Sequence, residues 1–181
     1  LTIKQYVPWI INGKDYGWME YIAQKPCANN TEVADFYKRI GSQLCLHYIF
    51  GSTDLHSENF IACGEFPVFI DLETILNPLT RLNNKHLNNL NKYIDIKFGL
   101  SVSRTGILPQ WLMGPDTNVY NNSSLGGSKA GLVYPNIIWK NINTDQMFYD
   151  YIELPPPEDK NLVYLNSQYQ DPSRFTKEIM E

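Results

Sequence analysis

The sequence predicts one domain of mixed α+β class, in which a long helix leads through a polar loop into a tight β-hairpin. Three observations support this prediction. Apolar residues recur with a helical period over 31–50, and two short β-rich runs flank a glycine turn shortly after it. The chain has 181 residues, of which 43% are hydrophobic. A chain of this length can bury a core without disulfides or metal ions.

The helix is expected over 31–50 because apolar residues hold one face at a period close to 3.6. Thr31 is the predicted N-cap, Glu32 suits the positive helix start, and Gly51 is the predicted stop. His47, near the end of this helix, is interpreted as a packed histidine rather than a ligand.

A polar loop over 51–58 then leads into two strands, 59–62 and 67–70, with a turn at 63–66 between them. Asp71 stands at the exit of the second strand. The predicted order is therefore helix, polar loop, hairpin and acidic residue.

The second half of the chain carries weaker signals. Residues 100–106 are expected as a short strand that closes in a turn, and residues 125–127 as a further turn. The asparagine-rich run 82–91 is interpreted as a solvated segment or a loop beside a site, and a last helix is expected from about Pro172.

Composition excludes several classes of partner. Fifteen basic residues against nineteen acidic ones give a net charge of −4, so no surface for nucleic acid or an anionic membrane is expected. No apolar run approaches the ~20 residues of a transmembrane helix, and no signal peptide opens the chain. Cys27, Cys45 and Cys63 fit neither a disulfide framework nor a zinc site, which favours a reduced, cytosolic setting.

The polar loop contains the residues that suggest chemistry. Asp54 and Asn59 form an Asp-Leu-x-x-x-Asn string, and Asp71-Leu72-Glu73 follows across the hairpin. Protein kinases use this order, with a catalytic Asp, an Asn five residues later and a metal-binding Asp beyond. A carboxylate can orient a hydroxyl nucleophile and accept its proton. Amide and carboxylate oxygens are the ligands that Mg²⁺ of ATP prefers.

Each residue alone has an ordinary structural interpretation. An Asp-x-x-x-x-Asn string arises by chance, Asp71 could be a turn residue at a strand end, and His56 and Glu73 could be surface polar residues. No glycine-rich phosphate loop or strand lysine precedes Asp54, and 53 residues are too few for a nucleotide-covering lobe. The ordered set therefore predicts a catalytic-loop lobe without most of its partner lobe.

Several segments, in order, resemble the dehydratase domain of type II lanthipeptide (lantibiotic) synthetases, the LanM family, from about Tyr16 to Glu181. The matching segments are Tyr16–Ile22, Phe36–Gly41, Gly51–Asn59, Ile70–Thr74, Arg104–Pro109, Leu125–Gly127 and Asn143–Met147. The resemblance implies an incomplete, lipid-kinase-like catalytic lobe. It also implies an enzyme that uses ATP and Mg²⁺ to phosphorylate Ser and Thr of a precursor peptide, then eliminates phosphate to give dehydroalanine and dehydrobutyrine.

The resemblance also implies roles for single residues. Asp54 would activate or orient the substrate hydroxyl, and Asn59 and Asp71 would hold magnesium. His56 matches a catalytic position and Glu73 a position of the cofactor-binding set. Arg104 and its neighbour Thr105 match a segment implicated in elimination. In place of an acidic residue often found before the Leu-Gly-Gly turn, this chain has the run 121–124, Asn-Asn-Ser-Ser.

On this resemblance, residues 1–181 are part of a dehydratase domain whose nucleotide-covering part and zinc-bearing cyclase domain lie outside the chain. The expected partners are the precursor peptide and the rest of the parent synthetase. The expected location is the cytoplasm, where the synthetase could associate with a membrane export complex. The chain alone is expected to be inactive, because a phosphate-binding lysine and a further arginine of the family fall outside it.

Two other functions remain compatible with the loop residues. A small-molecule kinase of the aminoglycoside or choline kinase type also pairs Asp-x-x-x-x-Asn with Ile-Asp-x-Glu, although it leaves the segments around Arg104 and Leu125 unexplained. A kinase-fold module that binds a leader peptide without turnover is the second alternative. A phosphorylated product with no loss of water favours the first alternative, and tight peptide binding that does not depend on ATP favours the second.

Overall fold

The computed structural model describes residues 3–76, 89–113, 119–126, 134–154 and 159–181. They form two compact units, of which the first comprises 1–127 and 160–181 and the second comprises 128–159. The mixed α+β content agrees with the prediction. The helices are α1 (Asn30–Ile49), α2 (Asn89–Gly99) and α3 (Thr176–Met180), with 3₁₀ turns at Ser57–Asn59, Val102–Thr105 and Pro172–Phe175.

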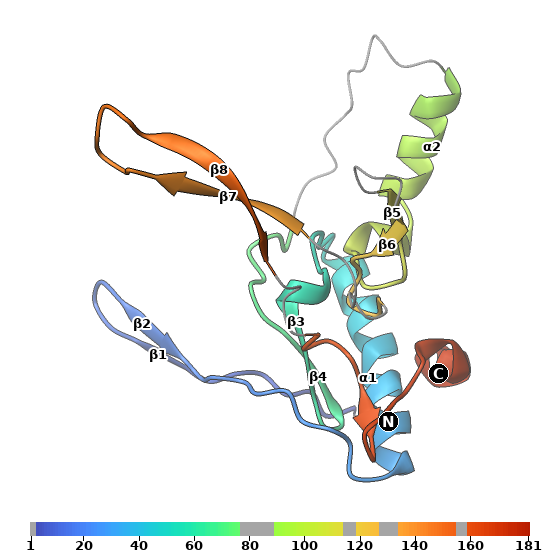
Figure 1. Cartoon of the computed structure of the whole chain (residues 1–181). Helices are drawn as coiled ribbons and strands as arrows, with labels where there is room; N and C mark the ends of the chain where they lie inside the picture. Colours follow the sequence, from blue (N-terminus) through green and yellow to red (C-terminus); the bar gives the residue numbers. More distant parts are fainter. Residues whose placement is uncertain (1–2, 77–88, 114–118, 127–133, 155–158) are drawn as a thin grey trace. The chain divides into compact units, whose positions relative to one another are not determined.

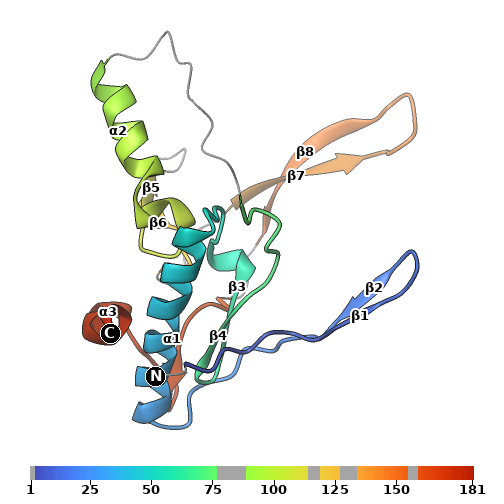
Figure 2. The same cartoon turned by 180° about the vertical axis from the view of Figure 1, so that it is seen from behind.

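In the part of the chain that the structure describes, each strand pairs with one other strand in an antiparallel two-stranded sheet, and isolated parallel bridges also join Lys25 to Cys63 and Cys27 to Leu165. The paired strands are β1 (Ile10–Asn12) with β2 (Gly17–Met19), β3 (Phe60–Cys63) with β4 (Phe66–Phe69), β5 (Trp111–Met113) with β6 (Val119–Asn121), β7 (Tyr134–Lys140) with β8 (Phe148–Leu154), and β9 (Tyr164–Leu165) with β10 (Gln168–Tyr169). Figure 1 labels α1, α2 and β1 to β8, and Figure 2 also labels α3.

Helix α1 confirms the predicted helix but begins earlier than expected. The N-cap is Asn29, not Thr31, because the Asn29 side chain accepts a hydrogen bond from the Glu32 N–H at 3.0 Å. The Glu32 carboxylate in turn accepts one from the Ala28 N–H at 2.8 Å. The two bonds satisfy amides at the helix start that would otherwise lack partners, so Thr31 falls inside the first turn.

The end of α1 agrees with the prediction and directs the chain into the polar loop. Gly51 adopts φ 64°, a left-handed conformation that glycine enters without steric cost. The Gly51 N–H donates to the Tyr48 carbonyl at 3.1 Å and the Ser52 N–H to the His47 carbonyl at 2.9 Å, which is a Schellman ending. His47 is buried, as predicted, with its Nδ1 3.0 Å from the Ser52 hydroxyl.

The β3–β4 hairpin also confirms the prediction to within a residue, with Cys63 paired to Phe66 across a two-residue turn. Gly64 in that turn has φ 59°. In Figure 1, and from behind in Figure 2, the hairpin lies beside α1. Apolar side chains from both elements form one core. Its buried members are Cys27, Val33, Phe36, Tyr37, Ile40, Leu55, Phe60, Ala62, Phe69, Ile107, Leu125 and Val163.

The C-terminal segment also packs against α1. The ring of Phe175 stacks on Tyr37 with centroids 4.5 Å apart, and the Tyr37 hydroxyl donates to the Gln170 carbonyl at 2.6 Å. Gly41 permits α3 to approach, because a Cβ there would overlap the Ile179 carbonyl. The predicted last helix is confirmed as a 3₁₀ turn from Pro172 followed by α3.

The predicted strand at 100–106 was wrong: this segment forms the 3₁₀ turn Val102–Thr105, which ends at Gly106 with φ 85°. The Thr105 hydroxyl donates to the Val102 carbonyl at 2.8 Å, and a side chain that bonds its own turn competes with extended pairing. The predicted turn at 125–127 lies partly outside the described residues, because Gly127 is not among them.

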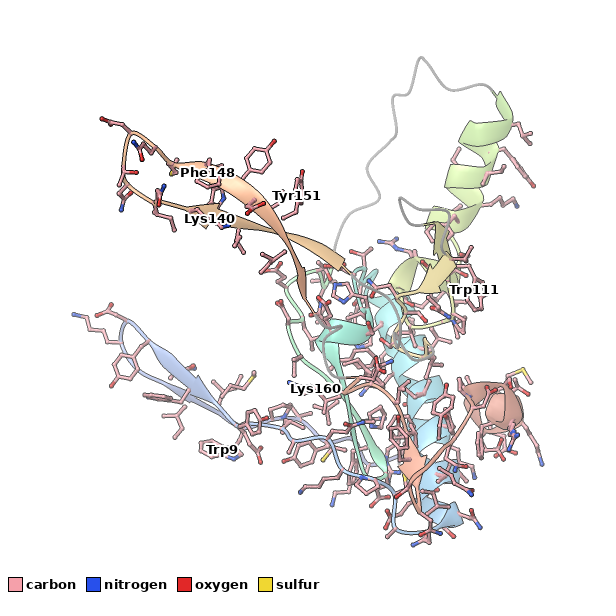
Figure 3. All side chains as sticks on the ribbon, in the orientation of Figure 1. Trp9, Trp111, Lys140, Phe148, Tyr151 and Lys160 are labelled. Atoms are coloured by element: carbon pink, nitrogen blue, oxygen red, sulfur yellow. The ribbon has the colours of Figure 1, made fainter. Side chains whose placement is uncertain are left out.

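Exposed aromatic side chains line two of the hairpins. Figure 3 labels Trp9 beside β1, and Phe148 and Tyr151 on β8. Within the β7–β8 unit, Lys140 forms an ion pair with Asp150, and the rings of Trp139 and Tyr149 meet edge to face at 5.9 Å.

Within the described ranges, no helix combines the length and apolar character needed to cross a membrane.

Candidate functional site

The candidate site is built on the loop between α1 and β3. Asp54 in this loop has φ 62°, and its side chain is 59% exposed. The next residue, Leu55, is fully buried and belongs to the core. An exposed carboxylate is thus attached directly to a buried anchor, which limits how far its backbone can move.

His56 faces the Asp54 carboxylate. The distance from His56 Nε2 to Asp54 Oδ1 is 3.6 Å, within ion-pair range and too long for a hydrogen bond. His56 Nδ1 accepts the Glu58 N–H at 3.2 Å. In the neutral ring the proton must therefore reside on Nε2, the nitrogen that faces Asp54. His56 also starts the 3₁₀ turn that carries Asn59.

Asn59 and Asp71 lie at the same end of the β3–β4 hairpin. The Ile70 N–H donates to the Asn59 carbonyl at 2.9 Å, which places Asp71 one residue beyond a backbone bond to Asn59. The Asn59 Nδ2 donates to the Asp54 carbonyl at 3.1 Å. Its amide nitrogen is therefore engaged, and the amide oxygen is the atom able to bind a cation. Asp71 is exposed and, like Asp54, left-handed, with φ 56°.

Glu73 lies in the turn that follows Asp71 and is exposed. This turn is tied back to the start of the loop, because the Thr74 hydroxyl donates to the Thr53 carbonyl and the Leu76 N–H donates to the Phe50 carbonyl at 2.9 Å. Glu73 is therefore held on the same side of the molecule as the loop, while its carboxylate stays in solvent.

Arg104 and Thr105 occupy different environments although they are neighbours. Arg104 Nη2 donates to the Gly51 carbonyl at 2.8 Å, which ties the 3₁₀ turn to the start of the loop. Thr105 is fully buried, and its carbonyl accepts the Leu55 N–H at 2.9 Å. In this structure Thr105 supports the backbone beside Asp54 without contributing a solvent-exposed hydroxyl.

A segment that the sequence analysis did not identify lies across the loop. The Ser57 N–H donates to the Asn122 carbonyl at 2.9 Å, and the Ser57 hydroxyl donates to the Asn122 side chain at 3.1 Å. Ser123 forms a single antiparallel bridge with His56. In the sequence, the run 121–124 stands out only as a departure from the family pattern. Nothing local in the run indicates that it contacts a loop so distant in sequence.

These segments enclose a cavity of about 230 Å³ next to the Asp54 side chain. The cavity brings together three predicted site residues, Asp54, His56 and Arg104. Its other lining residues are Phe98, Gly106, Gln110, Asn122 and Ser123. Asn59, Asp71, Glu73 and Thr105 are not part of this lining. The predicted role of each site residue, inside or outside the lining, stays a prediction.

Asn59 and Asp71 are the residues predicted to hold Mg²⁺. Among the described residues, no three His, Cys, Asp or Glu side chains come close enough together to hold a metal ion. Asn59 and Asp71 offer one amide oxygen and one carboxylate at the same end of the hairpin. Mg²⁺ in phosphoryl-transfer sites is typically held by one or two such groups, with phosphate oxygens and water completing its octahedron. The residues therefore fit magnesium that arrives with a nucleotide.

Comparison with known proteins identifies the family to which this chain belongs. The family model described as "Domain of unknown function (DUF4135)" matches residues 1–181, the entire chain. The lacticin 481/lactococcin biosynthesis protein LcnDR2 of Lactococcus lactis subsp. lactis is 36% identical over 128 residues, or 71% of this chain. The aligned region spans 13% of that relative. The resemblance stated above is thereby confirmed: the chain belongs to the DUF4135 family and is a LanM-like segment of a lanthipeptide synthetase.

Proposed function

We propose that this chain carries part of the active site for ATP-dependent dehydration of Ser and Thr in a lanthipeptide precursor, a step in lantibiotic biosynthesis. The observation that carries the proposal is the shared cavity of Asp54, His56 and Arg104, with Asn59 and Asp71 on the adjoining hairpin end. The relative described above is named a lacticin 481/lactococcin biosynthesis protein, and this name supports a role in lantibiotic biosynthesis.

In the first half-reaction, the oxygen of a substrate hydroxyl forms a bond to the γ-phosphorus of ATP, and ADP leaves. Asp54 orients that hydroxyl and accepts its proton, a role suited to an exposed carboxylate held in a fixed backbone conformation. His56 directs its Nε2–H toward the same carboxylate and limits its rotation.

Asn59 and Asp71 would hold a magnesium ion with their side-chain oxygens, since both residues lie at the same end of the hairpin. When bound with ATP, that ion would neutralise charge on the transferred phosphoryl group. Glu73 extends the acidic edge of this site. Because Asn59 also bonds the Asp54 carbonyl, the positions of metal ligand and base are coupled through a single side chain.

In the second half-reaction, a base removes the α-proton, the Cβ–O bond breaks, and phosphate leaves as the Cα–Cβ double bond forms. Both half-reactions together remove one water from the residue. Arg104 lines the cavity and supplies positive charge for the departing phosphate. Thr105 acts behind it, since its hydroxyl closes the 3₁₀ turn that carries Arg104.

The proposal extends to the parent protein. The chain would be the catalytic-loop lobe of a lipid-kinase-like dehydratase domain, and the precursor peptide and a cyclase domain of the same synthetase would be its partners. The complete dehydration activity is accordingly assigned to the parent. We expect the 181-residue chain alone to produce no dehydrated peptide.

The test is the intact mass of a candidate precursor peptide after incubation with the full-length parent protein, ATP and Mg²⁺. We expect each reacted residue to lose a molecule of water, which is the net result of the two half-reactions. Asp54→Asn should abolish every mass change, because the substituted amide cannot accept the proton. Thr105→Ala should leave phosphate adducts on the peptide. Asp15→Asn, on an exposed residue between β1 and β2, is the matched control and should behave like wild type.

The other outcomes separate the alternatives. Stable phosphate gain in the wild type, with no loss of water, would replace the dehydratase with an ordinary kinase. Peptide binding without ATP and without any mass change would point to a binding module.

A further inference from the structure

Asn161 is a buried side chain with a specific pair of hydrogen bonds. In the sequence it comes shortly before β9; it is 5% exposed and belongs to the first unit together with the loop. Its Nδ2 donates to the Ser124 carbonyl at 3.1 Å and to the Gly126 carbonyl at 3.2 Å. One amide group thus fixes the backbone of the segment that lies across the loop.

Ser124 connects this segment to the residue after Asp54. Ser124 is fully buried, and its hydroxyl donates to the Leu55 carbonyl at 2.6 Å. The N–H of Leu55 donates to Thr105 on the opposite side. Both backbone polar groups of Leu55 are therefore held by residues far away in sequence, and both bonds are shielded from water.

Asp54 needs such support because of its backbone. A residue other than glycine at φ 62° carries conformational strain, which persists only where the surroundings over-determine the conformation. Three contacts restrain the peptide units around Asp54: Ser124 and Thr105 on Leu55, and Asn59 on the Asp54 carbonyl. Removing one of them gives the backbone a way to relax and turns the carboxylate away.

We propose that Asn161 and Ser124 are positioning residues, which hold the Asp54 carboxylate in its working direction through a buried relay from Asn161 to Ser124 to Leu55. This inference rests on the proposed function for its kinetic consequence. The relay itself is a property of the fold and can be measured separately.

The chemistry of the relay requires an amide at position 161. Two carbonyl oxygens face Asn161, and only a group with two N–H donors satisfies both. In Asn161→Asp an ionised carboxylate would face those carbonyls and break the relay. Burial raises the pKa of the introduced carboxyl, so its protonated form becomes available at mildly acidic pH and restores one donor.

The kinetic test compares Asn161→Asp with Asn166→Asp in the full-length parent protein, with phosphorylation of the precursor peptide as the readout. Asn166 is exposed in the β9–β10 turn and is the matched control. We expect kcat for Asn161→Asp to fall about tenfold or more at pH 8, with KM for ATP within about twofold of wild type. The ratio of variant to wild-type kcat should rise as pH decreases, whereas Asn166→Asp should match wild type throughout.

The structural test uses Ser124→Ala, which removes only a hydroxyl. Hydrogen exchange should become faster in peptides from 53–59 while α1 keeps its wild-type protection. Unchanged exchange in the loop would overturn the relay even if no activity were measurable. If Ser124→Ala lost protection equally in the loop and in α1, and kcat of Asn161→Asp did not recover at low pH, both residues would contribute only to the general stability of the fold. An inactive wild type with faster loop exchange in Ser124→Ala would reject the proposed function but retain the relay.

Discussion

The loop Thr53–Asn59 and the α1–hairpin core beneath it differ in how their residues are stabilised. In the core, Phe36, Ile40 and Phe60 are completely buried, and the described residues of α1, β3 and β4 contain no positive φ angle. In and beside the loop, by contrast, Asp54 and Asp71 have left-handed backbones and exposed side chains. The loop depends on hydrogen bonds from distant segments to keep this conformation.

Stability and chemistry therefore reside in different residues. Burial of apolar surface in the core provides the free energy of folding. The loop uses part of that free energy to hold Asp54 in a strained conformation beside a cavity, as is common at functional sites. Substitutions of the loop's functional side chains should therefore lower kcat, whereas substitutions in the core should lower the free energy of unfolding.

The largest separation is expected from Asp54→Gly. Loss of the carboxylate should lower the rate of peptide phosphorylation by ~10²- to 10⁴-fold, the usual contribution of a positioned acid–base group. Because glycine adopts φ 62° without strain, the free energy of unfolding should exceed that of Asp54→Ala by roughly 1 kcal/mol. Single-turnover kinetics in the parent and urea denaturation of the chain measure the two effects.

Asp54→Ala is the control, because it removes the same carboxylate and keeps a Cβ. If both variants unfold at the same urea concentration, Asp54 carries no backbone strain, and the contrast between loop and core fails at its central residue.

A smaller effect, confined to stability, is expected from Arg39→Leu in the core. Arg39 is 8% exposed, and its Nη2 is 2.8 Å from the Glu65 carboxylate, while its Nε donates to the Lys4 carbonyl at 2.7 Å. Loss of this network should reduce the free energy of unfolding by about 3 kcal/mol, because its partners lose a buried cation. The phosphorylation rate per folded molecule should remain that of wild type.

Lys38→Leu is the matched control on the same helix. Its ammonium lies 3.5 Å from Glu181, with side chains 37% and 47% exposed, so the pair is worth less than ~1 kcal/mol. Equal unfolding free energies for the two variants would show that the Arg39 network does not stabilise the core.

The smallest effect concerns pH and His47. Burial holds the pKa of His47 below its usual value of 6.5, so between these two values the unfolded chain binds more protons than the folded one. The stability from neutral His47 is complete above pH ~6.5 and is lost as pH falls toward the native pKa, by at most ~1.4 kcal/mol per pH unit. Melting temperatures from pH 8 to 5 should decrease more for wild type than for the double variant His47→Phe/Ser52→Ala. Parallel curves would exclude a contribution from His47.

Local patterns were enough to predict α1, the β3–β4 hairpin and the C-terminal helix. Helical periodicity, the glycine at the end of α1, the short turn at Gly64 and the proline at 172 each act within a few residues. The N-cap was displaced because Asn29 and Glu32 form a reciprocal pair that Thr31 cannot match. No local pattern predicted α2, whose first three residues, 89–91, belong to the asparagine-rich run. The interpretation of that run as a solvated segment or loop was therefore wrong for 89–91, and its residues 82–88 lie outside the described ranges.

Local patterns set the order of loop, hairpin and acidic residues, and the motif segments in that order carry the resemblance to the family. Three features arise only in the folded molecule: Thr105 is buried, Asp54, His56 and Arg104 share a cavity, and Ser124 and Asn161 support the loop. These features depend on interactions between residues far apart in sequence. Ser124 bonds a residue 69 positions away, and Asn161 bonds one 37 positions away. Such bonds form only once the core has brought these segments together, and a polar residue in the linear sequence carries no mark of its distant partner.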